Sequence, residues 1–269
     1  CRSFSFLQKE NLSVKKCIGH YFFCKVHAII SKIDKRRKDI MYTFQSRIRY
    51  SETDKTGHLK LESLLDYFQD CSTFQSEDIG LGLGYCKDHH VVWVMSSWQI
   101  IVERYPAMGE RVIVGTLPYE FKGFVGYRNF VMMDEQGRNL AYANTIWSLL
   151  DTDTGKPAKP DAQMLQGYVL EPRIDMEYAP RRIKIPEESF TGEPVHIKDI
   201  HLDTNQHVNN GQFVRIAIDS LERDFPVAQL RAEYKKQVLL GEVLTPHLSR
   251  TCEGRHVIVL ENSGKDICC

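Results

Sequence analysis

The segment from position 203 to position 210 carries the densest polar chemistry in the sequence. It reads Asp-Thr-Asn-Gln-His-Val-Asn-Asn and runs directly into an apolar helical pattern. The imidazole of His207 can take up and release protons, the carboxylate of Asp203 can act as a base or orient the imidazole, and the amide of Asn205 can hydrogen-bond a carbonyl. These residue types at this spacing predict acid–base chemistry on a carbonyl group.

Part of this pattern also has a structural explanation, because Asp and Asn are common helix caps. A cap requires one such side chain, whereas the loop offers Asp, Asn, His, Asn and Asn within eight positions. We therefore favour the functional interpretation over capping alone. Backbone N–H groups at the start of the following helix would add donors for a developing oxyanion.

The sequence contains an earlier copy of this arrangement. Asp54 precedes His58 by four residues, as in the later loop, and an amphipathic helical pattern follows each histidine. A Gly-Glu pair between two strand-like segments also occurs once in each half of the chain, at positions 109–110 and 241–242. Two correspondences in the same order predict one structural unit written twice.

The rest of each half is rich in Val, Ile, Phe, Tyr and Trp, with turn residues between the apolar runs, which predicts strands. One long helix and a run of antiparallel strands per half indicate an α+β fold in which each sheet curls around its helix. The predicted strands span residues 91–104, 111–120, 123–134 and 138–151 in the first half, and residues 194–200, 228–237, 242–252 and 256–261 in the second.

Changes in composition along the chain predict its domain boundaries. We expect residues 1–40 to be an extension outside the fold, because they lack periodicity and end at Met41, where a strand pattern begins. Residues 41–155 and 193–269 form the two halves, and the proline-rich stretch 156–192 links them. The last hairpin is barely begun at the carboxyl end, so we expect the second half to be truncated.

The bulk properties argue against several kinds of partner. Thirty-five basic and thirty-five acidic residues give a formal net charge of zero, so no overall field draws the chain to nucleic acid. No apolar run reaches the roughly 18 residues that a membrane span needs. The eight cysteines form no CxxC pair and no zinc-ribbon spacing, which predicts reduced thiols, no metal site and a cytoplasmic protein.

The polar loop at 203–210, together with Glu233-Tyr-Lys-Lys-Gln237 downstream, resembles the catalytic half of the acyl-acyl carrier protein thioesterases, a family known from plastids and bacteria. The resemblance covers about residues 42–269 and implies a tandem hot-dog fold. It also implies that the Asp, Asn and His of the loop are catalytic. The second half would then be the catalytic domain, and the first half would mainly shape the acyl pocket.

The same resemblance implies the reaction and the partner. The substrate would be a fatty acyl group in thioester linkage to the phosphopantetheine of acyl carrier protein, in the cytoplasm of a bacterium. Hydrolysis would release the fatty acid and terminate fatty acid synthesis without a cofactor. Docking of an acidic carrier protein calls for basic residues, either Arg181, Arg182 and Lys184 or Lys235 and Lys236. A homodimer is compatible with the sequence, which does not fix the oligomeric state.

One position departs from the family pattern. Plant members have Glu-Cys after the Tyr-basic-basic run, whereas this chain has Gln237-Val238. Val238 cannot be a nucleophile and Gln237 cannot be a general base, although its amide can position water by hydrogen bonds. We therefore expect water to attack the thioester carbonyl with help from Asp203 and His207. Covalent attack by Asp203 stays open as an alternative.

The first copy of the motif, Asp54-Lys-Thr-Gly-His58, itself resembles the Asp-x-x-Gly-His motif of single-domain acyl-CoA thioesterases. It has Thr56 where the second copy has Asn205. We therefore expect the first copy to be a relic with structural duties, in which Glu52 and His58 cap and brace the helix that follows.

An acyl pocket requires an apolar tunnel with few polar groups. Trp93 and Trp98, together with Leu64 and Phe68 of the first helical pattern, are the residues that we expect to line it. For each of them taken singly, ordinary core packing is the favoured interpretation.

Other functions fit parts of the sequence. Hydratases and dehydratases on the same fold carry an Asp-x-Asn-Pro-x-His pattern, whereas here the Pro is absent and the His lies one residue closer to the Asp. A noncatalytic acyl-binding protein would not need so dense a polar loop. An acyl-CoA thioesterase stays open, because the sequence does not distinguish coenzyme A from acyl carrier protein.

Overall fold

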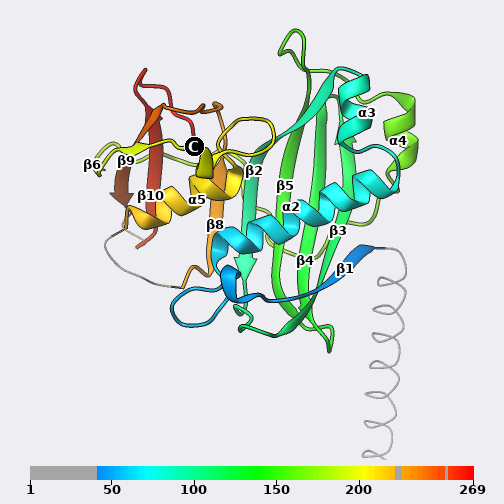
Figure 1. Cartoon of the computed structure of the whole chain (residues 1–269), viewed down its shortest axis with the longest axis horizontal. Helices are drawn as coiled ribbons and strands as arrows, with labels where there is room; N and C mark the ends of the chain where they lie inside the picture. Colours follow the sequence, from blue (N-terminus) through cyan, green and yellow to red (C-terminus); the bar gives the residue numbers. More distant parts are fainter. Residues whose placement is uncertain (1–40, 222–225, 252–253) are drawn as a thin grey trace, which may run out of the picture. The chain divides into compact units, whose positions relative to one another are not determined.

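The computed structural model describes residues 41–221, 226–251 and 254–269. The expected extension over residues 1–40 lies outside the described residues. From Tyr42 onward the chain forms two antiparallel sheets and two principal helices, α2 (Leu61–Asp78) and α5 (Asn210–Asp219), as Figure 1 shows. The shorter elements are α3 (Leu83–Asp88), α4 (Ala162–Gly167) and the 3-10 turns η1 (Tyr50–Glu52) and η2 (Asp199–His201).

The first sheet has six strands in the order β1-β3-β4-β5-β2-β8, all antiparallel. Five of these strands belong to the first half, but β8 comes from the second half and pairs with β2 from Ser97↔Glu233 to Ile101↔Gln229. The second half therefore completes the sheet of the first. The strands are β1 (Tyr42–Arg47), β2 (Val91–Val102), β3 (Arg111–Lys122), β4 (Val125–Asp134), β5 (Asn139–Asp151) and β8 (Gln229–Glu233).

The second sheet is smaller and is built around β9 (Val243–Arg250). One neighbour is β10 (His256–Asn262), and the other side carries the short strands β6 (Phe190–Thr191) and β7 (Val195–His196). The prediction of one strand over residues 194–200 is therefore mostly wrong, because only Val195 and His196 form a strand there. After β7 the chain turns into η2, because this segment must lead into the polar loop in the way that η1 does in the first half.

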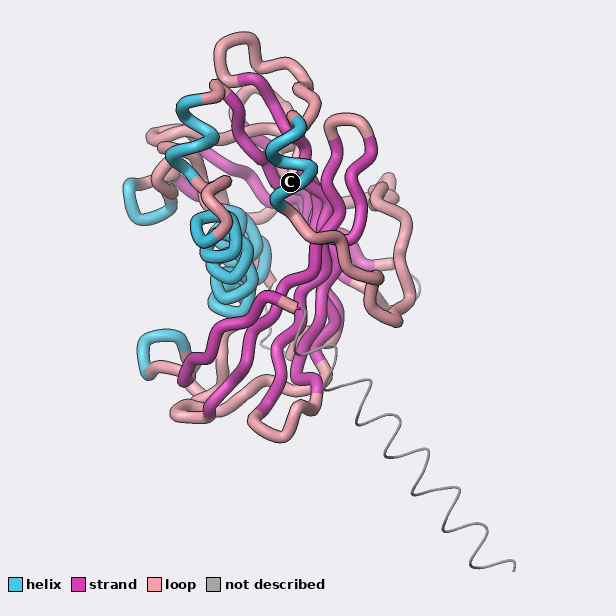
Figure 2. The backbone as a smooth tube through the Cα atoms, turned by 90° about the vertical axis from the view of Figure 1, so that its right-hand side faces the viewer, coloured by secondary structure: helices cyan, strands magenta, loops and turns pink. Residues whose placement is uncertain are grey.

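The long helical coils lie on one side of the strands in the view of Figure 2. The buried face of α2 is the apolar stripe predicted from the sequence, and its centre is Phe68, which is fully buried. The Phe68 ring stacks on Phe130 of β4 and on Trp98 of β2, with centroid distances of 5.3 and 6.1 Å. This aromatic cluster joins α2 to the middle of the first sheet.

The linker is held against the first sheet by buried amide side chains. Gln99 donates to the carbonyl of Glu177 at 2.8 Å and accepts the Ala179 N–H at 2.9 Å. The side-chain oxygen of Asn129 accepts the hydroxyl of Tyr178 at 3.1 Å. Since Gln99 and Asn129 are 5% and 0% exposed, the segment around position 178 is an ordered covering of the sheet rather than a loose tether.

The repeated Gly-Glu pair has a specific structural reason. Gly109 and Gly241 both adopt a left-handed conformation, at φ +82° and +83°, which glycine tolerates best. The glutamate that follows accepts the backbone N–H three residues before it, from Ala107 to Glu110 at 3.0 Å and from Leu239 to Glu242 at 2.5 Å. Each pair therefore closes the same tight turn.

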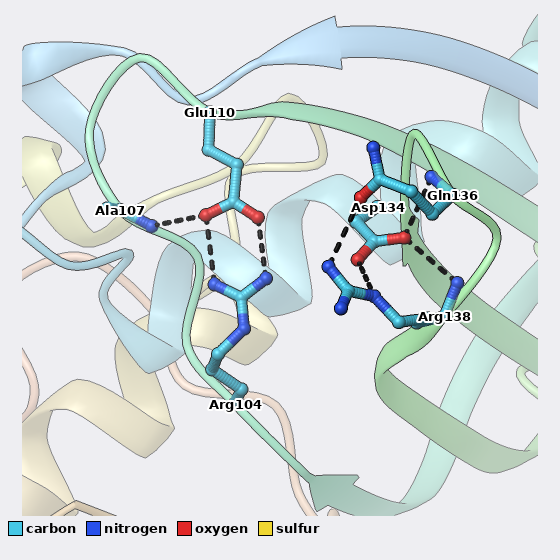
Figure 3. A network of polar contacts seen from close by, with 6 residues as sticks. All are labelled: Arg104, Ala107, Glu110, Asp134, Gln136 and Arg138. Atoms are coloured by element: carbon cyan, nitrogen blue, oxygen red, sulfur yellow. Dashed lines mark hydrogen bonds and ion pairs between the residues drawn. The ribbon is translucent and has the colours of Figure 1, made fainter.

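In the first half the turn glutamate also takes part in an ion pair. Arg104 donates two hydrogen bonds to Glu110, at 2.6 and 2.9 Å, beside a second network in which Asp134 accepts from Gln136 and Arg138 (Figure 3). The hydrogen bond from Arg104 lowers the pKa of Glu110 below its ordinary value, against the opposing effect of burial. The charged form of Glu110 is therefore the form that stabilises the fold.

We expect Glu110→Gln to remove a pH-dependent part of the stability. Because the folded pKa of Glu110 is lowered, its contribution is complete above the unfolded value of 4.5 and is lost as the pH falls through the folded value. In urea unfolding, the free energy of unfolding of wild type should exceed that of the variant by up to about 1 kcal/mol at neutral pH. This difference should disappear below about pH 4. Glu135→Gln, at an exposed and weakly paired position, is the matched control. A gap that stays constant with pH would contradict the assignment.

Candidate active site

The polar loop is organised around the carboxylate of Asp203. Its Oδ1 accepts the backbone N–H groups of Asn205 at 2.8 Å and of His207 at 3.3 Å, while its own N–H donates to the His207 carbonyl at 2.8 Å. Gln206 at the tip has φ +63°, and a bridge between Leu202 and Val208 closes the base. These bonds fix the loop without using the side chains of Asn205 or His207.

The cap of helix α5 is neither Asp203 nor Asn205, the first Asp and Asn of the loop. Asn209 precedes α5, and its Oδ1 accepts the N–H of Gly211 at 2.7 Å. Asn205 and His207 make no side-chain hydrogen bond within the described residues; the first is exposed and the second is half-buried. An amide and an imidazole are therefore both available at the loop surface to a bound molecule.

The first copy of the motif has the same backbone but a different side-chain arrangement. Asp54 accepts the N–H groups of Thr56 at 2.8 Å and of His58 at 3.2 Å, and Gly57 at the tip has φ +80°. The Thr56 hydroxyl donates to Asp54 at 2.7 Å and lies 3.0 Å from Nδ1 of His58. Thr56 thus engages the histidine in the first copy, whereas Asn205 leaves His207 free in the second.

Gln237 lies on the segment beside the polar loop. The N–H of Val208 donates to the carbonyl of Val238 at 3.0 Å, which aligns the two segments. Neighbouring side chains of an extended segment point to opposite sides. Val238 is fully buried in the core of the second half, so Gln237, which is exposed, faces outward near the loop.

Helix α2 of the first half contacts the start of α5, next to the polar loop. The sequence did not predict this contact. Asn210 donates from its side chain to Gln69 of α2 at 3.3 Å, and the hydroxyl of Tyr234 donates to the Asn210 carbonyl at 3.0 Å. A Cβ placed on Gly211 would lie 3.3 Å from an Asp66 oxygen, so glycine permits this close approach. Tyr234 could have been identified from the sequence, because it belongs to the segment 233–237 that carries part of the family resemblance.

The four residues predicted to line an acyl pocket lie within or beside the core under α2. Leu64, Phe68 and Trp98 are 1%, 0% and 2% exposed, and Trp93 is half-buried against Phe121 at a centroid distance of 5.9 Å. The indole N–H of Trp98 is buried and has no acceptor among the described residues. A buried donor without a partner costs about 1–3 kcal/mol.

A hollow of about 370 Å³ lies on one flank of α5, next to the turn that precedes Asp203. Counted from the His58–His207 pair, the counterpart of Ile216 in the first half is the larger Tyr67, which stacks on Phe44 at 6.2 Å. The hollow is lined by Glu193, Val195, Ile200, His201, Gln212, Arg215, Ile216, Asp219 and Ser220.

The basic residues predicted to dock a carrier protein are all exposed. The segment that carries Arg181, Arg182 and Lys184 is fastened by Arg231, which donates to the carbonyls of Pro180 and Arg182. The other two candidates have acidic neighbours: Lys235 lies 4.0 Å from Glu233, and Lys236 pairs with Asp266. The first group is therefore freer to meet an acidic partner.

The described cysteines do not form a reactive thiol at this site. Burial raises the pKa of Cys71 and of Cys269 to about 12, and that of Cys268 to about 11. Thiols with such pKa values stay protonated near neutral pH. Among the described residues, no group of three or more His, Cys, Asp or Glu side chains could hold a metal ion, and no helix is long and apolar enough to cross a membrane.

Comparison with known proteins gives two family matches that together cover most of the chain. The acyl-ACP thioesterase N-terminal domain model matches residues 39–168, and the C-terminal domain model of the same family matches residues 184–269. Two acyl-[acyl-carrier-protein] hydrolases of Cuphea viscosissima, FATB3 and FATB1, are 26% and 22% identical over 80% and 76% of the chain. The chain spans about half the length of these curated relatives, 57% and 52%.

Solved structures share the fold. An acyl-ACP thioesterase from Bacteroides thetaiotaomicron has a TM-score of 0.77 at 22% identity, covering 86% of this chain and 96% of its own. The 12:0-ACP thioesterase from Umbellularia californica has a TM-score of 0.73 at 18% identity, covering 85% and 94%.

Proposed function

Because the chain belongs to the acyl-acyl carrier protein thioesterase family, we propose that it hydrolyses the thioester of a fatty acyl group carried on acyl carrier protein. The products would be the free fatty acid and carrier protein with a free phosphopantetheine thiol. The observation that carries this proposal is the loop on which Asn205 and His207 keep their side chains free while Asp203 fixes the backbone.

The proposed chemistry is based on the residue types that this loop and the neighbouring segment carry. The His207 imidazole takes a proton from water, and the water oxygen attacks the thioester carbonyl carbon. The Asn205 amide donates to the carbonyl oxygen as negative charge develops on it, and the first backbone N–H of α5 adds a second donor. The carbon–sulfur bond then breaks, and the imidazolium returns its proton to the leaving thiolate. The second Asp203 oxygen stabilises the imidazolium, and the Gln237 amide orients the water.

The two halves would divide the work. The second half carries the polar loop and is the catalytic half, while the first half holds the acyl chain in the apolar layer around Trp93, Trp98, Leu64 and Phe68. The exposed Arg181, Arg182 and Lys184 would meet the acidic carrier protein. We place this reaction in the bacterial cytoplasm, with the protein acting as a monomer or a homodimer.

Hydrolysis of a panel of acyl-acyl carrier proteins tests this function directly. We expect the purified chain to release thiol from saturated acyl chains of a preferred length, with a kcat between about 1 and 10³ per second. An enoyl-acyl carrier protein serves as the control substrate. Loss of the enoyl absorbance without thiol release would identify a hydratase instead, and binding of acyl chains without either signal would identify a noncatalytic protein.

A further inference from the structure

Gln69 and Asn210 form a hydrogen-bonded pair of side-chain amides between α2 and the first residue of α5. Both have intermediate exposure, and the Asn210 amide donates to the Gln69 oxygen at 3.3 Å. The hydroxyl of Tyr234 holds the Asn210 carbonyl from the other side at 3.0 Å. Since Asn210 follows His207 by three residues, the amide pair lies directly beside the polar loop.

The duplicated structure provides an internal comparison for this cluster. Counted from the His58–His207 pair, the counterparts of Asn210 and Gln69 are Leu61 and Ile218. Counted from the Gly109–Gly241 pair, the counterpart of Tyr234 is Val102. All three polar residues are thus apolar at the related place. Because a hydrogen-bonded polar pair contributes little net stability over an apolar pair, helix packing alone does not explain the cluster.

The amide pair has unused hydrogen-bonding capacity. Each side-chain amide has two donor hydrogens and one acceptor oxygen. Within the described residues the pair uses one N–H of Asn210 and the oxygen of Gln69, so the NH₂ of Gln69 and the oxygen of Asn210 stay available. Exchanging the nitrogen and oxygen positions of both side chains gives the same result, one free NH₂ and one free oxygen.

We propose that Gln69 and Asn210 bind the phosphopantetheine arm through the amide nearest to its sulfur, an inference that rests on the proposed function. Two methylene groups separate the sulfur from this amide, so a thioester carbonyl held at Asn205 and His207 brings the amide to the start of α5. The N–H and C=O of a secondary amide point in opposite directions, and each therefore reaches a different side chain. The Gln69 NH₂ donates to the carbonyl, and the Asn210 oxygen accepts the N–H.

Two thioesters of one fatty acid test the pairing. The N-acetylcysteamine thioester retains this amide, and the S-pentyl thioester replaces it with methylene groups. We expect wild type to favour the first substrate by about 10- to 100-fold in kcat/KM, as two hydrogen bonds predict. Gln69→Ile and Asn210→Leu, which copy the residues of the other half, should each lose about 10-fold on the amide substrate. Gln69→Ile should stay within about 2-fold of wild type on the S-pentyl thioester.

Gln163→Leu, an exposed glutamine on α4, is the matched control and should keep the wild-type preference. Equal losses on both thioesters would mean that the pair serves only the structure and would overturn the proposal, and so would a wild type without preference. In both cases hydrolysis itself remains, so the proposed function stands. Hydrolysis of neither thioester, nor of any acyl-acyl carrier protein, would overturn both.

Discussion

His207→Ala is expected to lower kcat for acyl-acyl carrier protein hydrolysis by about 10²- to 10⁴-fold, the range for loss of a general acid–base group. The imidazole makes no hydrogen bond within the described residues, and the loop is held by its backbone and by Asp203. We therefore expect an unchanged melting temperature. Steady-state thiol release at saturating substrate, together with a thermal melt, measures both quantities.

The chain supplies its own control in the first copy of the motif. His58 lies on a loop with the same backbone hydrogen bonds, but its ring nitrogen is engaged by Thr56 at 3.0 Å. His58→Ala should leave kcat within about 2-fold of wild type. If His58→Ala lowered kcat as much as His207→Ala does, the assignment of catalysis to the second loop would be wrong.

Phe68→Ala is expected to cost about 3–5 kcal/mol of unfolding free energy, the largest single loss that we predict for stability. The ring is 0% exposed and stacks on both Phe130 and Trp98, so its removal leaves a cavity lined by side chains that cannot close in on it. Urea unfolding, with the midpoint and slope compared to wild type, measures the change.

Phe74→Ala is the matched control, because Phe74 lies on the same helix with 43% of its surface exposed. It contacts Phe44 edge to face at 5.4 Å, and its removal should cost less than about 1.5 kcal/mol. Equal costs at positions 68 and 74 would contradict the view that the aromatic cluster of Phe68, Trp98 and Phe130 is the centre of the first half.

Much of the architecture could be predicted because the same sequence pattern occurs in both halves of the chain. The paired Asp-to-His spacing gave the two loops and the helices after them, and the family resemblance gave the tandem hot-dog fold, which the family match and the solved structures confirm. Four of the five strands of the first half, β2 to β5, were predicted to within about two residues at their ends, since their apolar runs are long and bounded by turn residues.

The missed features depend on contacts between distant segments. The pairing of β8 with β2, the hydrogen bond from Asn210 to Gln69, and the fastening of the linker by Gln99 and Asn129 involve residues far apart in the chain. A single sequence shows periodicity along an element but not which element lies next to it. Asn209 was missed as the cap because several Asn and Asp residues competed for that role, and only the backbone distinguishes them.

The pairing of β8 with β2 determines whether the two halves can be separated. The residues of β8 complete the hydrogen bonding of β2, yet they are encoded more than a hundred positions later. Expressing either half separately would leave a bare strand edge that invites aggregation. A chimaera that combines halves from two relatives would need a β2 and a β8 whose side chains fit each other. Because the two halves share one sheet, we expect them to unfold together in a single cooperative transition.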